Sequence, residues 1–446
     1  MSSGKTVTII GGGIAGISAA VFLAEKDFKV TIYESSPKPG GRAYSFFDRE
    51  KNQFFDNGQH ILAGWYKNAF DYLKIIGSYD KLNFQKRLEI NFISTERKLY
   101  RLKFPDLKPP VNVLAGLLKF GALNLRDKIS VLKIRKLLNE NELTGNFDNA
   151  SNLLLNIGQT DNLIKYFWEP FIYAVFNTVP ERVSAEIFLN VIKKGFSANQ
   201  NSVLVIPEVN LNELLINDAV SYLGKKGARI MLNSGVKQIL FSKDLKTAEY
   251  LLMEDGSKVC SDYIISAVPF FSFRKLFDVK TYEVKGFTAD RMKTSCIVSV
   301  HMFFHKKINE SMLADNSFGM TGLIGTNVQW IFKRSDLHLS LVISNADELG
   351  ISDMSSDEIY KLCLKDLSSA LNGFEETMIS DHKVIKEKRA TFIPDKESCK
   401  YRPGQITESA NFFTAGDWTD TKLPSTIEGA VLSARICAEK IIEAEN

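Results

Sequence analysis

A glycine-rich turn near the N-terminus constrains the fold more than any other feature of this chain. Residues 6–10 form an apolar strand pattern, the spacing Gly11-x-Gly13-x-x-Gly16 follows at once, and a helical pattern continues to about residue 26. In such a unit the first glycine permits a tight turn, the second lets the backbone approach a pyrophosphate, and the third lets helix and strand pack closely. The free N–H groups at the start of the helix favour an anion. The residues predicted to contact a dinucleotide here are Gly11, Gly13, Ile14, Ala15 and Gly16.

A second strand pattern supports this interpretation. Residues 29–33 form an apolar strand that ends at Glu34, eighteen residues after Gly16. A carboxylate at this distance accepts hydrogen bonds from both hydroxyl groups of a ribose. Because an accidental glycine turn would not bring this acid with it, the sequence predicts a site for an adenine dinucleotide.

The next turn favours one class of dinucleotide protein. Gly41 and Arg42 follow the ribose-binding acid in a proline- and glycine-rich stretch, residues 37–43, and they can close over the pyrophosphate from the other side. A G-G-R turn at this place is common in flavoproteins of the glutathione-reductase type, whereas a nicotinamide dehydrogenase has no reason to carry it. Residues 54–60 then predict a short strand that runs into the polar loop Asp56-Asn-Gly-Gln-His60.

Length and composition set limits on the class of protein. A chain of 446 residues with 45% hydrophobic content can bury a large core, and its length predicts two or three domains. The five cysteines form no C-x-x-C pair, and the five histidines lack the spacing of metal ligands. We therefore expect reduced thiols, no disulfide framework and no metal site. Glycines interrupt the apolar N-terminal run and no cleavage site follows it, so we expect a cytoplasmic protein.

The positive charge is concentrated in one segment. The net charge of the chain is +4, but residues 81–140 contain 14 Lys or Arg against 5 Asp or Glu. Within them the apolar run 111–125 is shorter than the roughly 20 residues that span a bilayer. One apolar helix among cations is suited to an anionic membrane surface, so we expect peripheral membrane association near residues 103–128. The flanking cations are Lys103, Lys108, Lys119, Arg126 and Lys128.

Two alternatives to a membrane contact differ in strength. A buried helix with a solvated basic flank would have the same sequence pattern, and this alternative stays open. A nucleic-acid partner is excluded, because no binding motif or stacking pattern accompanies the charge.

The middle of the chain is less informative. Residues 80–200 are expected to be mostly helical, and the aromatic segment 167–176 is expected to be mainly core, with some members lining an apolar ligand cavity. The nucleotide fold is expected to resume at residues 211–269, where Ser234-Gly-Val236 resembles the G-x-V turn of this flavoprotein class; the resemblance implies that the Val236 backbone contacts adenine. The alternating residues 297–304 predict a strand of a second domain that covers the substrate.

The last forty residues complete the dinucleotide pattern. Residues 411–417 predict a strand that ends in an acid, and Ser425 and Glu428 predict a capping box at the start of a long terminal helix. The positive end of that helix would point at a bound flavin. The residues predicted to contact the cofactor here are Gly416, Asp417, Thr426, Ile427 and Ala430.

Four separated features together resemble the amine oxidase and phytoene desaturase superfamily of FAD proteins. They are the first glycine turn with Glu34, the G-G-R turn, Ser266-Ala-Val-Pro269, and the C-terminal stretch A-G-D-W-T-D-T-K-L-P-S-T-I-E-G-A. The resemblance implies an α/β fold, with a glutathione-reductase-type Rossmann domain for FAD and a mixed α+β substrate-binding domain. The FAD domain would comprise residues 1–80, 203–274 and 405–446, and the substrate domain residues 81–202 and 275–404.

Within the superfamily the chain is most similar to the hydroxysqualene dehydroxylase family of hopanoid-producing bacteria. The similarity lies in residues 56–64, 329–332 and 388–392 and in Asp417-Trp-Thr. One departure is Lys333, which stands where the family pattern W-I-F-D-R has an acid. The resemblance implies removal of the hydroxyl group of hydroxysqualene with reduced FAD to give squalene, a long apolar isoprenoid substrate, and an unidentified reductant for the flavin.

The same resemblance places the loop after residue 55 against the flavin. Asn57, Gly58 and Gln59 are then expected to contact the cofactor, and His60 is the titratable group best suited to protonate the departing hydroxyl. His60 as a packing wedge beside the flavin is the alternative. Three further functions stay open for the whole chain: a phytoene or carotenoid desaturase, a flavin amine oxidase, and a prenyl-lipid escort protein without redox chemistry.

Overall fold

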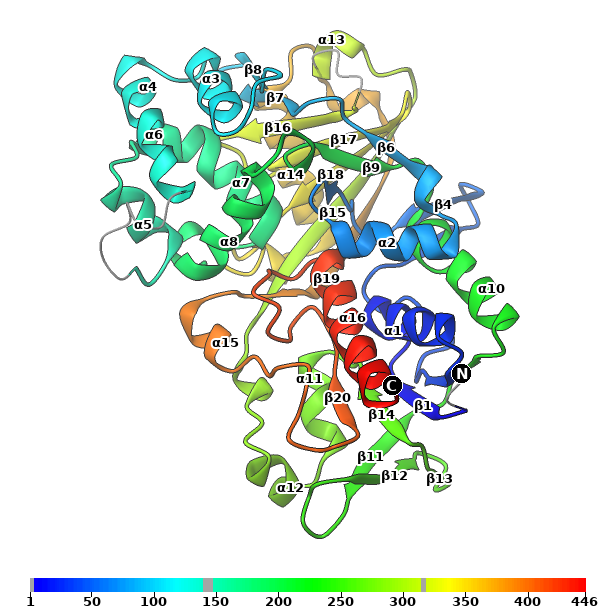
Figure 1. Ribbon diagram of the computed structural model, residues 1–446. Coiled ribbons are helices and arrows are strands. Elements are labelled where there is room, and N and C mark those ends of the chain that lie inside the picture. Colours follow the sequence, from blue (N-terminus) through cyan, green and yellow to red (C-terminus); the bar gives the residue numbers. More distant parts are fainter. Residues whose placement is uncertain (1–3, 139–146, 314–317) are drawn as a thin grey trace.

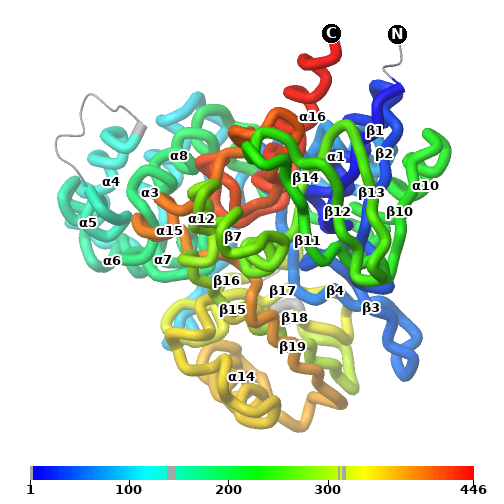
Figure 2. Tube along the Cα trace, turned by 90° about the horizontal axis from the view of Figure 1, so that it is seen from below, coloured from blue at the N-terminus to red at the C-terminus, as the bar shows by residue number. Residues whose placement is uncertain are grey.

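The computed structural model describes residues 4–138, 147–313 and 318–446. Two sheets organise the molecule, one in each half of Figure 1, and a group of helices flanks the upper one. The first described residues and the C-terminal end lie close together beside the lower sheet, as both views show (Figures 1 and 2).

The lower sheet is parallel throughout and has the order β10-β2-β1-β14-β20. Its strands are β1 (Thr6–Ile10), β2 (Lys29–Tyr33), β10 (Arg229–Met231), β14 (Tyr263–Ser266) and β20 (Phe412–Thr414). A parallel sheet is normally buried on both faces, and strands β1, β14 and β20 are accordingly mostly buried. Both faces are covered here, since Ile265 joins the core on the helical side while its neighbour Ile264 joins the core on the other side.

Helices cover one face of this sheet and a small sheet covers the other. Helix α1 (Ile14–Glu25) packs beside α16 (Ile427–Ala444) and α2 (Lys67–Ile76) (Figure 1), which explains why α1 is apolar on every side. The opposite face meets strands β11 (Val236–Phe241), β12 (Ala248–Met253) and β13 (Lys258–Val259). This layered arrangement confirms the expected Rossmann-type α/β fold.

The upper sheet has seven strands in the order β19-β15-β18-β17-β16-β7-β8, all antiparallel except the pair β7 and β16. Its strands are β7 (Glu89–Ser94), β8 (Leu99–Lys103), β15 (Thr294–Phe304), β16 (Met320–Ile324), β17 (Trp330–Ser335), β18 (His338–Ile343) and β19 (Ile379–Phe392). Helix α14 (Ser356–Ala370) packs on the outer face (Figure 2), where it meets Val298, Val300 and Met302. Alternation along a strand therefore turns Ile297, Ser299 and His301 to the inner face.

The predicted helical character of residues 80–200 is wrong for its first part. Residues 82–103 form β6 (Leu82–Phe84), β7 and β8, and helices begin only at α3 (Val111–Lys119). The strand β7 is stabilised by pairing with β16, more than 220 residues later, so its own sequence gives little sign of it.

The predicted single apolar helix over residues 111–125 is also wrong, because α3 ends at Lys119 and α4 (Leu125–Val131) starts anew. Asn124 accepts the backbone N–H of Asp127 at 3.1 Å, and the Asp127 carboxylate accepts the backbone N–H of Asn124 at 2.9 Å. This reciprocal capping favours a fresh helix start at that point. The proposed domain boundaries stay a prediction, although the strands of the two large sheets fall on either side of them.

Candidate functional site

A large cavity of about 880 Å³ extends from the carboxyl ends of β1 and β2 to the inner face of the seven-stranded sheet. Such a position, outside the carboxyl ends of parallel strands, is where open α/β sheets bind their ligands. The predicted site residues that line it are Gly11, Gly13, Ile14, Ala15, Glu34, Gly41, Arg42, Asn57, Gly58, Gln59, His60, Val236, Gly416, Asp417, Thr426, Ile427 and Ala430. Gly16 lies behind them, where a Cβ would stand 2.0 Å from the carbonyl oxygen of Gly11.

Two glycine turns face each other at one end of the cavity. Gly13 and Gly40 form a parallel bridge, and the backbone N–H of Gly40 donates to the carbonyl of Gly12 at 2.8 Å. A Cβ on Gly41 would stand 3.1 Å from the Cα of Gly13. Backbone therefore forms this wall, and its bare surface fits the close approach of a pyrophosphate.

The Glu34 carboxylate is fixed at the same end. One oxygen accepts the backbone N–H of Gly12 at 2.6 Å, and the other accepts the backbone N–H of Ser36 at 2.8 Å. Both bonds orient an acceptor-only group at the cavity wall, as the hydroxyls of a ribose require. On these grounds the residues present fit an adenine dinucleotide.

The C-terminal stretch meets the G-G-R turn across the cavity. Asp417 forms an ion pair with Arg42 and a hydrogen bond with Ser425, while Arg42 also donates to the carbonyl of Ala390 at 2.9 Å. The side chain of Asn57 donates to the carbonyl of Arg42 at 2.8 Å. Four separate segments of the chain are thus held together around the middle of the cavity.

The capping box predicted at the start of α16 is wrong in detail. Thr426, rather than Ser425, caps the helix and accepts the backbone N–H of Gly429 at 3.0 Å. Glu428 turns away and accepts hydrogen bonds from the backbone N–H groups of Asn68 and Ala69. The first N–H groups of a helix lack partners within it, and Glu428 supplies partners for two of them in α2. The N-terminus of α16 still borders the cavity through Thr426 and Ile427.

The other half of the cavity is mainly apolar. The seven-stranded sheet contributes Ile297, Met320, Trp330, Phe332 and Val342. The aromatic segment behaves as expected, since Phe167, Trp168 and Phe176 are buried core, whereas the adjacent Tyr173, Ala174 and Val175 line the cavity. Sequence reasoning missed the cavity role of the sheet residues; alternation along β17, with Trp330 and Phe332 on one face, was the available sign.

The loop of residues 56–60 separates two spaces. His60 lines the large cavity, and burial lowers its pKa, although the nearby Asp56 charge opposes the shift. Asp56 does not face that cavity. Its carboxylate accepts the Ser45 hydroxyl at 2.7 Å and the backbone N–H of Leu211 at 3.0 Å, and it lines a smaller chamber instead.

One acid in the large cavity was not predicted by any sequence pattern. Glu387, on β19, lines the cavity, and its carboxylate lies 3.5 Å from the side-chain nitrogen of Asn57. Lys333, which stands where the family pattern W-I-F-D-R has an acid, lies outside the cavity. It pairs with Asp336 at 3.0 Å. Within residues 4–138, 147–313 and 318–446 no three His, Cys, Asp or Glu side chains gather as ligands for a metal ion.

Known proteins resemble this chain over nearly its whole length. The model of the flavin-containing amine oxidoreductase family matches residues 14–442. A hydroxysqualene dehydroxylase of Zymomonas mobilis is 28% identical over 439 residues, 97% of each chain. A 15-cis-phytoene desaturase of Solanum lycopersicum is 24% identical over 457 residues, 98% of this chain and 77% of the desaturase. A solved oxidoreductase from Methanosarcina mazei has the same fold, with a TM-score of 0.74 at 15% identity over 97% of this chain and 100% of the other.

The family match includes Glu34, the G-G-R turn and the start of α16, so it covers most of the geometry described above. It confirms the sequence-based expectation of a flavoprotein with FAD as its cofactor. The chain belongs to the family of flavin-containing amine oxidoreductases and is an FAD-dependent oxidoreductase.

Proposed function

We propose that this oxidoreductase removes the hydroxyl group of hydroxysqualene reductively and yields squalene. The two-part cavity is the observation that carries the proposal: its dinucleotide end opens directly into an apolar end formed by side chains such as Trp330, Phe332 and Val342. A long hydrocarbon gains about 25 cal/mol for each Å² of apolar surface that it buries there. A small charged amine has much less to gain from such a wall.

The relatives support the same substrate class. The hydroxysqualene dehydroxylase of Zymomonas mobilis aligns end to end with this chain, whereas the tomato phytoene desaturase has about a quarter of its length outside the alignment. Both names refer to isoprenoid lipids. A desaturase running the same cofactor in the oxidative direction is the second candidate.

The chemistry assigned to the chain has three parts. Bound FAD in its reduced form supplies a hydride equivalent. The apolar walls exclude bulk water from a carbon that becomes electron-deficient when its allylic C–O bond breaks. The departing oxygen needs a proton, and we propose that His60, which borders the cavity beside Asn57 and Gln59, delivers it.

Single-turnover experiments test the proposal. The flavin of the purified protein is photoreduced without oxygen and mixed with hydroxysqualene, and the expected result is flavin reoxidation with formation of one squalene per flavin. In the converse arm, the oxidised protein is mixed with phytoene or with simple amines. Flavin reduction by phytoene would identify a desaturase and reduction by an amine an amine oxidase, and either result with no squalene in the first arm would refute the proposal.

We also propose that the surface around α4 contacts an anionic membrane. Among the described residues no helix is long and apolar enough to cross a bilayer. Leu125, Ile129 and Leu132 are nevertheless 77%, 59% and 51% exposed, and Arg126 lies among them on the surface. Exposed apolar side chains next to cations suit the boundary between headgroups and acyl chains. The apolar residues Val113 and Leu117 of α3, by contrast, are buried.

A further inference from the structure

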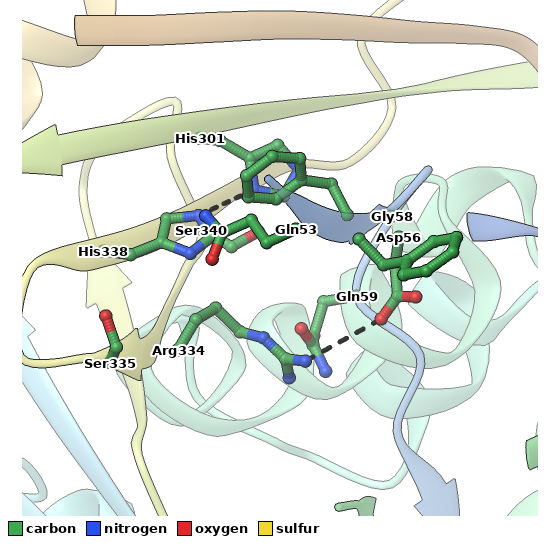
Figure 3. Close-up of a pocket in the computed structure, with 11 residues that line it drawn as sticks. Gln53, Asp56, Gly58, Gln59, His301, Arg334, Ser335, His338 and Ser340 are labelled. Atoms are coloured by element: carbon green, nitrogen blue, oxygen red, sulfur yellow. Dashed lines mark hydrogen bonds and ion pairs between the residues drawn. The ribbon is translucent and has the colours of Figure 1, made fainter. Parts of the chain in front are cut away.

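A second, smaller chamber lies next to the flavin cavity. Its volume is about 140 Å³, and its walls are mostly polar: Gln53, Asp56, Gly58, Gln59, His301, Arg334, Ser335, His338 and Ser340, with Phe54 and Phe55 (Figure 3). Gln53, Arg334 and Ser335 are exposed, so the chamber communicates with solvent. Gly58 and Gln59 line both the chamber and the flavin cavity, which makes this loop the partition between them.

Both spaces lie on the same face of the seven-stranded sheet. The register pairs Ser299 with Val342 and His301 with Ser340, and it pairs Phe332 with Ser340 on the other side. Val342 and Phe332 line the flavin cavity, whereas His301 and Ser340 line the chamber. Ser299 stands between the two, two residues from His301 and on the same face of β15.

Two buried polar atoms mark this boundary. The Ser299 hydroxyl is inaccessible and has no hydrogen-bond partner among the described residues, whereas the inaccessible His301 Nε2 has only the backbone of Asp56 beside it, outside normal hydrogen-bond geometry. Buried polar groups without a protein partner are normally satisfied by ordered water. The Gly58 backbone lies against Ser299 at the same place, since a Cβ on Gly58 would stand 3.5 Å from the Ser299 hydroxyl oxygen.

The charges of the chamber favour water over an ionic ligand. His301 Nδ1 and His338 Nε2 share a hydrogen bond of 2.9 Å (Figure 3), so one ring donates and the other accepts. Burial lowers the pKa of His301 to about 4, although the Asp56 backbone opposes the shift, and burial lowers the pKa of His338 to about 3. Both rings are therefore neutral near pH 7. The remaining charges, Arg334 and Asp56, lie 3.8 Å apart and offset each other.

We propose that the chamber and the Ser299–His301 face of β15 form a hydrated route along which protons pass from solvent to the flavin cavity. The inference rests on the proposed function, because that reaction consumes a proton. Each turnover would break one C–O bond and add hydride from reduced flavin to the carbon, and one proton would be needed for the oxygen to leave as water. The apolar half of the cavity offers few polar groups, and His60 must regain a proton after each turnover. Neutral imidazole rings and hydroxyls both donate and accept, so this face can relay protons without holding charge.

The matched variants Ser299→Val and Ser299→Thr test the route, because they have nearly the same shape and only threonine keeps the hydroxyl. With hydroxysqualene, Ser299→Val is expected to slow single-turnover flavin reoxidation by roughly 10- to 100-fold, part of the usual worth of a positioned proton donor. Its solvent deuterium isotope effect is expected to rise, since proton delivery becomes limiting. Ser299→Thr is expected to match the wild type in both measurements, and reoxidation by an outer-sphere oxidant should be the same in all three proteins. If the valine variant does not fold, Ser299→Ala replaces it.

A high-resolution crystal structure of the flavin-loaded protein supplies a readout that does not depend on the substrate. An ordered water is expected at Ser299 Oγ in the wild type, and it should be lost in the valine variant. If the wild type shows this water but does not act on hydroxysqualene, the proposed function fails, while the hydration of the Ser299 face of β15 stands. If the site is dry, or if the valine variant has the wild-type rate and isotope effect, the route is refuted.

Discussion

The two ends of the flavin cavity are built in different ways. Backbone forms much of the dinucleotide end, where glycines 11, 13, 40 and 41 come from two short turns and parallel strands hold them in place. Side chains form the apolar end, and they come from strands and a helix between residues 173 and 342. A site lined by backbone can be encoded by a local sequence motif, whereas a site lined by side chains depends on how distant segments of the chain pair. The first tolerates few substitutions, and the second can change its ligand by changing side chains.

The largest expected effect concerns the backbone end. Gly16→Val places a Cβ 2.0 Å from the Gly11 carbonyl oxygen, so the turn and α1 cannot keep their packing. We expect a loss of more than about 4 kcal/mol in the free energy of unfolding, the range of severe steric defects. Chemical denaturation and the flavin absorbance of the purified protein measure it. Gly224→Ala, in helix α10 (Asn217–Lys225), is the control, because its Cβ would meet nothing within 4 Å. A Gly16→Val protein with full flavin content would contradict the backbone account.

The junction of the two ends gives the next effect. His60→Ala is expected to slow single-turnover flavin reoxidation by hydroxysqualene about 100- to 10,000-fold, the usual worth of a positioned acid, with little change in FAD content. Stopped-flow absorbance follows the reaction, and His305→Ala, at an exposed position just after the end of β15, is the control. Loss of FAD would instead identify His60 as a packing wedge. Turnover near the wild-type rate would assign the proton to water or to another group.

Removal of one side chain at the dinucleotide end of the cavity is expected to have a smaller effect. Glu34→Ala removes an acceptor for the ribose and also the partner of the Gly12 N–H. We expect FAD binding to weaken by about 1.5–3 kcal/mol, or roughly 10- to 150-fold in Kd. Fluorescence titration of the apoprotein measures this, with the exposed Glu25→Ala as control. Unchanged affinity would mean that backbone contacts alone hold the adenosine half.

The smallest effect lies far from either end. Arg126→Gln, next to the exposed Leu125, is expected to weaken binding to anionic vesicles by about 1 kcal/mol, and added salt should mimic the change. Lys103→Gln should have less effect, because Lys103 already pairs with Glu89 at 2.8 Å. Vesicle sedimentation provides the comparison. A wild-type protein that ignores anionic vesicles at low salt would leave this surface without a membrane role.

The difference between the two ends also explains what the sequence could predict. The strand β1, the glycine turn, helix α1 and Glu34 are contiguous, so a local pattern was enough to place them. Strands β6, β7 and β8 were predicted as helix because the partners that stabilise β6 and β7 are in β9 (Leu204–Pro207) and β16, far along the chain. The position of Asp56 in the second chamber was out of reach for the same reason, since its partners Ser45, Leu211 and Arg334 meet only in the folded protein.

The pairing order of the two sheets also determines the order in which their strands can pair during synthesis of the chain. Strand β1 cannot pair with β14, nor β7 with β16, until the later strand of each pair has been synthesised. Strand β20 and helix α16 follow only after residue 411. Until then both sheets have open strand edges, and open edges favour aggregation. Thr426, Ile427 and Ala430 border the cavity from the start of α16, which follows every strand of both sheets along the chain. A complete flavin cavity therefore forms only after α16 has been made and packed beside the glycine turn that follows β1.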